Sequence, residues 1–410
     1  MKIVDLLKDK TATGRSGRIH VIKIKSKSAI IAYMIKFNMP SITGNELKKI
    51  EEVLKNDRYS GDGPYSKLSS DLIQQFTNSE KAYLVPSGTH ALEMAAILSE
   101  VKTSDEVIMP SFTFSSTANA FLLRGAKIKF VDIRSDTLNI NEELIEDAIT
   151  EKTKVIVPVH YAGVSCEMDK IMKIARDHGI TVVEDAAQCI LASYKGRPLG
   201  SIGDFGCLSF HETKNIHCGE GGSLLLNNLN YMARSDIVME KGTDRKKFIR
   251  GEVDKYTWQD IGSSFLMNEI TAAFLYDQLL NVKEIIKERM ALWNLYFETL
   301  DNLEGVDLPN IPTQCKHNGH IFHIRLKDAL TRDKLQKYLN EKGVQTATHY
   351  VPLHSSPFGS KVTTFVGDDI YTTRESSRLL RLPLHNRLTK TDIIYVSNMI
   401  KSFLSSEENK

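Results

Sequence analysis

The chain has 410 residues, of which 41% are hydrophobic and 25% are charged, so it is long enough for two globular domains with sizeable cores. Its formal net charge of +2 gives no reason to expect bulk binding to nucleic acid. The five cysteines form no C-x-x-C pair, which argues against a disulfide framework or a zinc ribbon and favours a reducing, cytoplasmic setting.

The first 33 residues differ from the rest of the chain. They contain eight Lys or Arg against two Asp and show no clear hydrophobic period, so we expect a basic, disordered extension over residues 1–33. Regular patterning begins at Met34, which makes this residue an alternative start. The early apolar run AIIAYMI is far shorter than the ~20 residues of a spanning helix, so we expect no membrane partner.

From about residue 41 to residue 228, predicted helices and strands alternate. Amphipathic or apolar helical patterns cover 45–56, 69–78, 89–100, 115–126, 141–150 and 167–179. Strand patterns cover 81–87, 106–111, 127–133, 154–161, 180–187, 208–210 and 221–228. Strands that alternate with helices of this length predict an α/β fold with a mostly parallel sheet covered by helices.

After about residue 240 the rhythm changes. Long helices are predicted over 269–300, followed by a strand at 319–326, a helix at 333–343 and a closing helix at 392–406. We therefore expect a large ligand-binding domain over 34–245. Residues 246–410 are expected to form interdomain helices and a smaller α+β domain.

Polar residues follow the ends of several predicted strands. Because ligands of open parallel sheets bind at the carboxyl ends of the strands, these residues should meet in one crevice. The segments are Ser87-Gly88-Thr89, Ser111 to Ser115, His160-Tyr161, Asp185 to Gln188, and LSFHETKNIHCGEGG, the stretch over 208–222 that contains Lys214.

The residue types in this crevice indicate a cofactor. The glycine patterns of a nicotinamide site and of a P-loop are absent from the sequence. VPSGTHALEM instead predicts a strand, a tight turn and a helix whose first N–H groups can hold a phosphate, although Ser87 could equally be a simple helix cap. A phosphate site, an Asp for a ring nitrogen and a lysine in a glycine-flanked loop together indicate pyridoxal phosphate.

Long stretches of the sequence resemble the DegT/StrS family of sugar-nucleotide aminotransferases, which have the aspartate-aminotransferase type fold. The resemblance runs from about Met34 to the C-terminus. It is carried by EVIMPSFTFSSTANAFLLRGAKI, VIVPVHYAGVSCEMD, VVEDAAQ, SFHETKN, GEGG, VDKYTWQDIGSS and RLLRLPL.

The resemblance implies a reaction and its partners. It is strongest to members that aminate C4 of dTDP-4-keto-6-deoxyglucose with L-glutamate. Their product is dTDP-4-amino-4,6-dideoxygalactose, a precursor of enterobacterial common antigen. The resemblance also implies a homodimer whose active sites form at the subunit interface.

Cofactor roles carry over from the family to this sequence by position. Lys214 in SFHETKN matches the lysine that bonds to the cofactor aldehyde. Asp185 matches the partner of the pyridine nitrogen, and Gln188 the residue at the phenolic oxygen. The phosphate and the ring are expected to lie against Gly88, Thr89, Ser209 and Phe114.

One departure from the family concerns the phosphate. Many members place an Asn from the neighbouring subunit there, whereas this sequence has Leu266 at the matching position. Ser263 or Ser264 could substitute for that Asn, so the cross-subunit contact is open.

Substrate residues are less well defined by the sequence. We expect substrate contacts from His160, Tyr161, Arg250 and His354, with a structural role for His160 equally open. The spacing of His211 and His217 suits no metal motif, so no metal is expected. Cys218 is expected to be a bystander thiol.

Several alternatives to this function are open. The acceptor could be another keto sugar nucleotide, aminated at C3 or linked to UDP. A cysteine desulfurase would need a reactive thiol, and a sugar dehydratase of the family would have His in place of Lys214. A non-catalytic, cofactor-binding regulator would keep the phosphate site without turnover.

Overall fold

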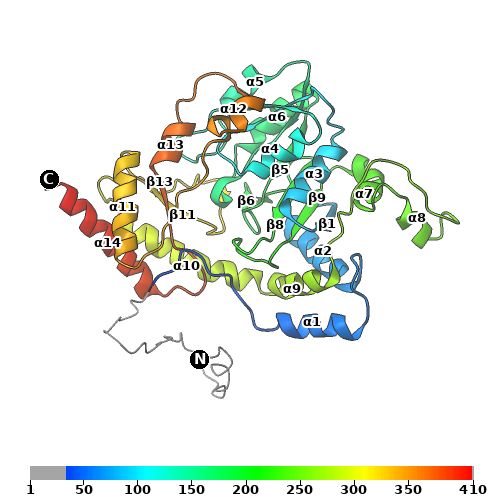
Figure 1. The fold of residues 1–410 in the computed structure, drawn as a ribbon, viewed down its shortest axis with the longest axis horizontal. Helices are drawn as coiled ribbons and strands as arrows, with labels where there is room; N and C mark the ends of the chain where they lie inside the picture. The colour runs from blue at the N-terminus through cyan, green and yellow to red at the C-terminus, as the bar shows by residue number, and fades with distance from the viewer. Residues whose placement is uncertain (1–33, 409–410) are drawn as a thin grey trace, which may run out of the picture.

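A computed structural model describes residues 34–408, and the predicted basic extension 1–33 lies outside the described residues (Figure 1). Its centre is an eight-stranded sheet. The strands are β1 (Lys81–Val85), β2 (Glu106–Pro110), β3 (Lys127–Val131), β4 (Thr153–Ile156), β5 (Thr181–Asp185), β8 (Phe205–Ser209), β9 (Gly222–Leu226) and β12 (Thr363–Phe365). Their order is β1-β9-β8-β5-β4-β2-β3-β12, and β9 runs antiparallel to both of its neighbours. The predicted α/β fold with a mostly parallel sheet is confirmed.

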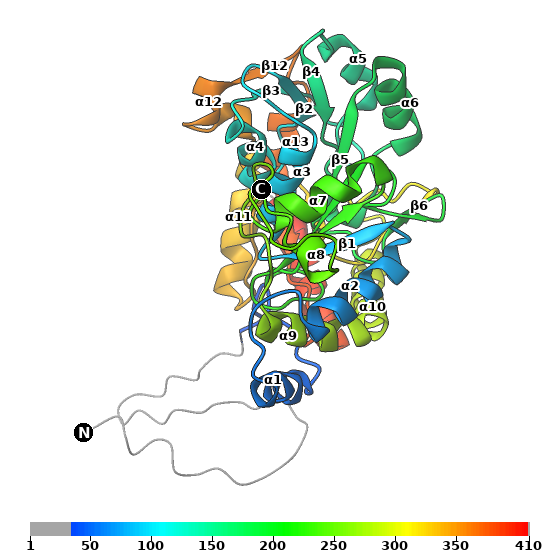
Figure 2. The ribbon, with the colours of Figure 1, turned by 90° about the vertical axis from the view of Figure 1, so that its right-hand side faces the viewer.

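Helices cover both faces of this sheet (Figures 1 and 2). One face packs against α3 (Gly88–Leu98), α4 (Ser115–Leu122) and α7 (Met232–Met239). The other packs against α2 (Pro64–Thr77), α6 (Met168–His178) and α9 (Glu269–Leu280). Side chains alternate along β1, so that Ala82 and Leu84 join one core cluster while Tyr83 and Val85 join the other. Burial on both faces explains why the strands are almost entirely apolar.

A third core cluster lies in the C-terminal part of the chain, where the sequence predicts a smaller α+β domain. It is built by α10 (Val282–Leu300), α11 (Ala329–Glu341) and α14 (Lys390–Glu408). These helices pack on a two-stranded antiparallel sheet of β11 (Phe322–Arg325) and β13 (Leu379–Leu382). In Figure 1 they form the left side of the molecule.

Each part of the chain also contributes a segment to the structure of the other part. Ile35 packs in the third cluster and pairs with Val344, whereas the C-terminal strand β12 lies beside β3 at the edge of the large sheet. Helix α9, which follows residue 245, belongs to the core of the large sheet. The hydrophobic clusters therefore follow no single cut of the chain, and the division at residue 245 stays a prediction.

The remaining elements are short or peripheral. Helix α1 (Glu46–Lys55) packs on α9, and α8 (Arg245–Ile249) projects at the right edge of Figure 1. A small sheet joins β6 (Ser193–Tyr194), β7 (Arg197–Pro198) and β10 (Cys315–Lys316). The others are α5 (Ile145–Ala148), α12 (Gly359–Val362) and α13 (Thr372–Arg378). Over residues 34–408, no helix has both the length and the apolar character needed to cross a membrane.

Candidate active site

A cavity of about 680 Å³ lies at the carboxyl ends of the parallel strands. Residues from both parts of the chain line it. All the residues predicted to contact the cofactor are among them: Gly88, Thr89, Phe114, Asp185, Gln188, Ser209 and Lys214. The parallel sheet brings them together because it places the ends of β1, β5 and β8 at one edge.

A polar cradle forms where β1 passes into α3. Ser87 caps the helix by accepting a hydrogen bond from the backbone N–H of His90 at 3.2 Å. The hydroxyls of Thr89 and Ser116 are 2.8 Å apart at the start of two helices that face the cavity. A Cβ added to Gly88 would lie 2.9 Å from the Cβ of Ser209, so glycine permits the close approach of α3 to β8. Hydroxyls and exposed N–H groups at a helix N-terminus suit a phosphate.

Asp185 is fixed at the end of β5 with only 7% of its surface exposed. The Thr117 hydroxyl donates to one carboxylate oxygen at 2.8 Å, and the backbone N–H of Ala187 donates to the other at 3.2 Å. A carboxylate held this rigidly at a cavity wall can accept a hydrogen bond from a protonated ring nitrogen.

Lys214 lies in a loop that closes on itself after β8. The backbone N–H of Phe210 donates to Gly221, and that of Lys214 donates to His211, both at 2.8 Å. Burial lowers the pKa of the Lys214 amine, and the nearby Asp185 carboxylate offsets part of this effect. The amine is thus neutral over a wider pH range than a surface lysine.

An aromatic wall completes the cavity. Phe114 is 59% exposed and its ring centroid lies 6.4 Å from that of Tyr350. The amide of Gln188 donates to the Tyr350 hydroxyl at 3.0 Å and accepts from the backbone N–H of Ala162 at 2.7 Å. Tyr350 lies in HYVPLH, residues 349–354, the stretch that ends at the predicted substrate residue His354.

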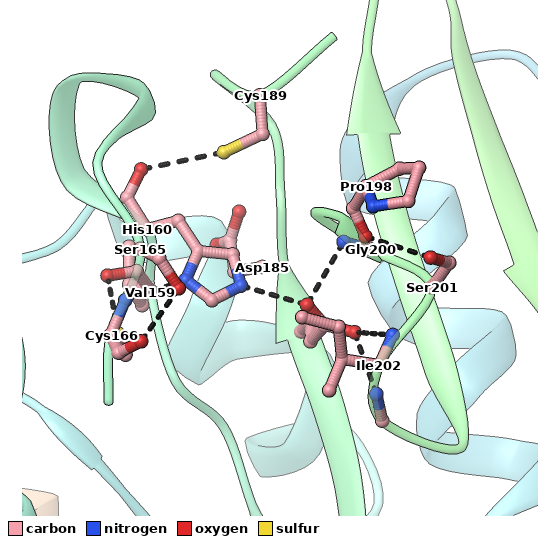
Figure 3. Close-up of polar contacts among 12 residues, drawn as sticks. Val159, His160, Ser165, Cys166, Asp185, Cys189, Pro198, Gly200, Ser201 and Ile202 are labelled. Atoms are coloured by element: carbon pink, nitrogen blue, oxygen red, sulfur yellow. Dashed lines mark hydrogen bonds and ion pairs between the residues drawn. The ribbon is translucent and has the colours of Figure 1, made fainter. Parts of the chain in front are cut away.

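His160 lines the cavity, but both of its ring nitrogens are bonded within the protein, which favours a structural role over the expected substrate contact (Figure 3). Its side chain is fully buried. Nδ1 accepts from the backbone N–H of Cys166 at 3.1 Å, so Nε2 carries the proton and donates to Glu184 at 2.9 Å. The structural alternative for His160 is therefore the one that the geometry supports.

Glu184 joins this histidine to a neighbouring turn. Its carboxylate also accepts from the backbone N–H groups of Gly200, Ile202 and Gly203 at 2.6–2.9 Å. The backbone N–H of His160 in turn donates to the carbonyl of Asp185 at 3.2 Å. The network of His160, Glu184 and the 200–203 turn thus holds the strand end that carries Asp185.

The three other predicted substrate residues do not line the cavity of their own chain, so their contacts with substrate stay predictions. Tyr161 is buried and its hydroxyl bonds to Nδ1 of His349 at 2.7 Å. His354 contacts Ser111 at 2.8 Å and Asp369 at 3.1 Å. Arg250 ends α8 on the surface, where it pairs with Glu252 and Asp236.

The sequence analysis missed side chains that the C-terminal part contributes to the cavity: Arg289, His320, His349, Tyr350 and Arg381. Arg381 carried a signal in the sequence, because it is a charged residue that interrupts the apolar run LLRL.

Leu266 supplies no polar atom to a phosphate. It is partly buried and packs against the core beneath α3 and α7. Ser263 and Ser264 pair through the backbone with Val238, Lys241 and Glu240 and do not line this cavity.

Comparison with known proteins identifies relatives along nearly the whole chain. The profile of the DegT/DnrJ/EryC1/StrS aminotransferase family matches residues 40–401. The uncharacterized protein MJ1066 of Methanocaldococcus jannaschii is 35% identical over 375 residues, 89% of this chain and 96% of that protein. The spore coat polysaccharide biosynthesis protein SpsC of Bacillus subtilis is 29% identical, over 92% of this chain and 98% of SpsC.

A solved structure adds the fold and the cofactor. Spr1654 of Streptococcus pneumoniae, solved in a PLP-form and a PMP-form, is 25% identical with a TM-score of 0.82 and covers 91% of this chain and 99% of its own. PLP is pyridoxal phosphate, and the present cavity fits it. A phosphate cradle, a fixed carboxylate and a buried lysine share one chamber, and Gly222 lets β9 lie against the cradle, since an added Cβ would come 2.4 Å from Ser87.

We expect Glu184→Gln to destabilise the cofactor-free protein by about 3 kcal/mol. The amide has one acceptor oxygen, which cannot serve His160 and the three N–H donors of the 200–203 turn together. Urea-induced unfolding measures the change. Glu151→Gln, at an exposed position, is the control and should stay within about 0.5 kcal/mol of the parent. Equal stabilities of the two variants would contradict the network.

Proposed function

The chain belongs to the DegT/DnrJ/EryC1/StrS aminotransferase family, and we propose that it transfers the amino group of L-glutamate to C4 of dTDP-4-keto-6-deoxyglucose. The products would be 2-oxoglutarate and dTDP-4-amino-4,6-dideoxygalactose, for cell-surface polysaccharide. The observation that carries this chemistry is the convergence of Lys214, Asp185 and the Ser87–Thr89 turn on one cavity. The name of SpsC supports the polysaccharide context.

The cofactor would supply the electron acceptor for the reaction. When bound, pyridoxal phosphate takes up the electrons of the C–H bond that breaks at the donor, provided that its ring nitrogen stays protonated. In our proposal the Asp185 carboxylate keeps that proton on the ring nitrogen by accepting a hydrogen bond from it. Thr117 and Ala187 fix the carboxylate at the cavity wall for this role. The cradle around Gly88 and Thr89 holds the phosphate.

Lys214 is proposed to move the protons. Its amine would take a proton from Cα of the donor and later deliver one to C4 of the sugar. Burial favours the neutral amine that the first step needs, since it lowers the lysine pKa. The amine approaches C4 from one side only, so the orientation of the bound sugar would set the configuration of the new amine.

The choice of acceptor is supported by resemblance to the C4-aminating members. Two of the quoted stretches now have structural roles of their own. His160 and Cys166, within residues 160–169, belong to the buried network behind Asp185, and residues 253–264 do not line the cavity of their own chain. In our proposal residues 253–264 belong to the interface between two copies of the chain.

A homodimer is proposed from exposed apolar side chains on α8 and on the loop that follows it; α8 lies at the right edge of Figure 1. Trp258 is 81% exposed, and Ile249, Tyr256 and Phe248 are exposed beside it in sequence. Apolar side chains gathered at one edge of a molecule suit a protein interface. The proposed occupant is a second copy, as the family resemblance implies.

A desulfurase is less well supported than an aminotransferase. Burial raises the pKa of the Cys218 thiol, whereas a sulfur-transferring cysteine needs a thiolate. All five cysteines are free thiols, which supports the proposed cytoplasmic setting.

The acceptor is tested by incubation with L-glutamate and a panel of dTDP- and UDP-linked keto sugars. We expect dTDP-4-keto-6-deoxyglucose to be consumed and its product to show a small H3–H4 coupling in the NMR spectrum, as for an axial amine at C4. A pocket that hydrogen-bonds one hydroxyl arrangement can reject another by roughly 10⁴-fold. A large H3–H4 coupling, amination at C3, or a clear preference for UDP-linked sugars would contradict the proposal.

For the dimer, we expect Trp258→Glu to weaken self-association by at least about 10-fold, because a charge would replace an apolar side chain at the interface. Sedimentation over a range of concentrations measures this. Leu330→Glu is the control, since Leu330 is 66% exposed on α11, in the other part of the chain. Dimers of equal affinity for parent and Trp258→Glu would place the interface elsewhere.

A further inference from the structure

The cavity carries more cationic than acidic side chains. Lys214, Arg289 and Arg381 line it, whereas the acidic side chains in the described lining are Asp185 and Glu220. The two arginines reach it from the C-terminal part, on α10 and β13. Such an excess of positive charge in a concave site attracts anionic ligands.

Arg289 already has partners in the protein. Its Nε donates to the carbonyl of Gly319 at 3.1 Å, and its Nη2 donates to the carbonyl of His320 at 2.9 Å. The side chain is 4% exposed. Arg289 therefore holds the backbone that precedes β11.

Arg381 lacks such partners. Its Nη1 contacts Nε2 of His349 at 3.3 Å, and its guanidinium lies 4.7 Å from the ring centroid of Phe37. Its Nε is buried without a hydrogen-bond partner. Over residues 34–408, no carboxylate forms an ion pair with it, although the nearby buried arginines Arg325 and Arg378 both pair with Glu375.

The surroundings of Arg381 keep it aimed at the cavity. The Tyr161 hydroxyl fixes His349 from behind at 2.7 Å, and His349 contacts the guanidinium. Arg381 is also close enough to Lys214 to disfavour a positive charge on that amine. A partly buried guanidinium whose Nε has no hydrogen-bond partner is costly unless an anion pairs with it.

We propose that Arg381 binds a carboxylate of the amino donor and of the oxo acid formed from it. The inference rests on the proposed function and names the residue that recognises the donor. Guanidinium and carboxylate match as two parallel hydrogen bonds, which gives orientation as well as affinity. Arg381 lines the cavity of its own chain, whereas Arg250 does not.

The test uses the holoenzyme and two unreactive probes, glutarate for the donor and dTDP for the sugar nucleotide. Calorimetric titration of Arg381→Ala should show glutarate binding weakened by about 10- to 100-fold, with dTDP binding unchanged. Arg381→Lys keeps the positive charge but cannot form two parallel hydrogen bonds, so glutarate binding should weaken less than in Arg381→Ala. Arg197→Ala, which removes an exposed arginine paired with Asp169, is the control and should bind both probes like the parent.

Kinetics separate recognition from a structural effect. The Arg381 variants should raise KM for L-glutamate while leaving KM for the sugar nucleotide and the melting temperature near those of the parent. Weaker dTDP binding with unchanged glutarate binding would overturn the inference in favour of a phosphate contact, and unchanged binding of both probes would also overturn it. A parent enzyme that binds glutarate through Arg381 but does not consume L-glutamate would instead refute the proposed donor.

Discussion

Burial of the Lys214 amine beside the Asp185 carboxylate is the constraint on which the site depends. A lysine withdrawn from water favours its neutral form, so burial lowers the pKa of Lys214 below its usual 10.5. The unfolded chain holds that proton more tightly than the folded chain. The stability of the cofactor-free protein therefore increases as the pH rises through the folded-state pKa toward 10.5. The fold thus gives up some stability below that pH and places a reactive amine in the cavity.

Much of the surrounding structure keeps that chamber in shape. The turn between β1 and α3 meets the end of β8 at Gly88, where any side chain would separate them. Behind the cavity, His160 and Glu184 tie the end of β5 to the 200–203 turn. These buried groups help to determine where the Asp185 carboxylate lies.

The sequence predicted the sheet and the cofactor residues for a physical reason. Parallel strands place their carboxyl ends at one edge, so order along the chain is sufficient to bring Gly88, Asp185 and Lys214 together. Arg381 and Tyr350 come from the C-terminal part, and no local pattern states how that part packs on the sheet. The role of His160 stayed open in the sequence because a position after a strand does not reveal which way the ring points or what it bonds.

The central claim is that Lys214 is the lysine that holds the cofactor, and reduction with borohydride tests it most directly. The protein is loaded with pyridoxal phosphate, reduced, digested and analysed by peptide mass spectrometry. The account predicts the cofactor's added mass on the peptide that contains Lys214 and no such label in the Lys214→Ala variant. Label on another lysine of the parent protein, or no label at all, would contradict it.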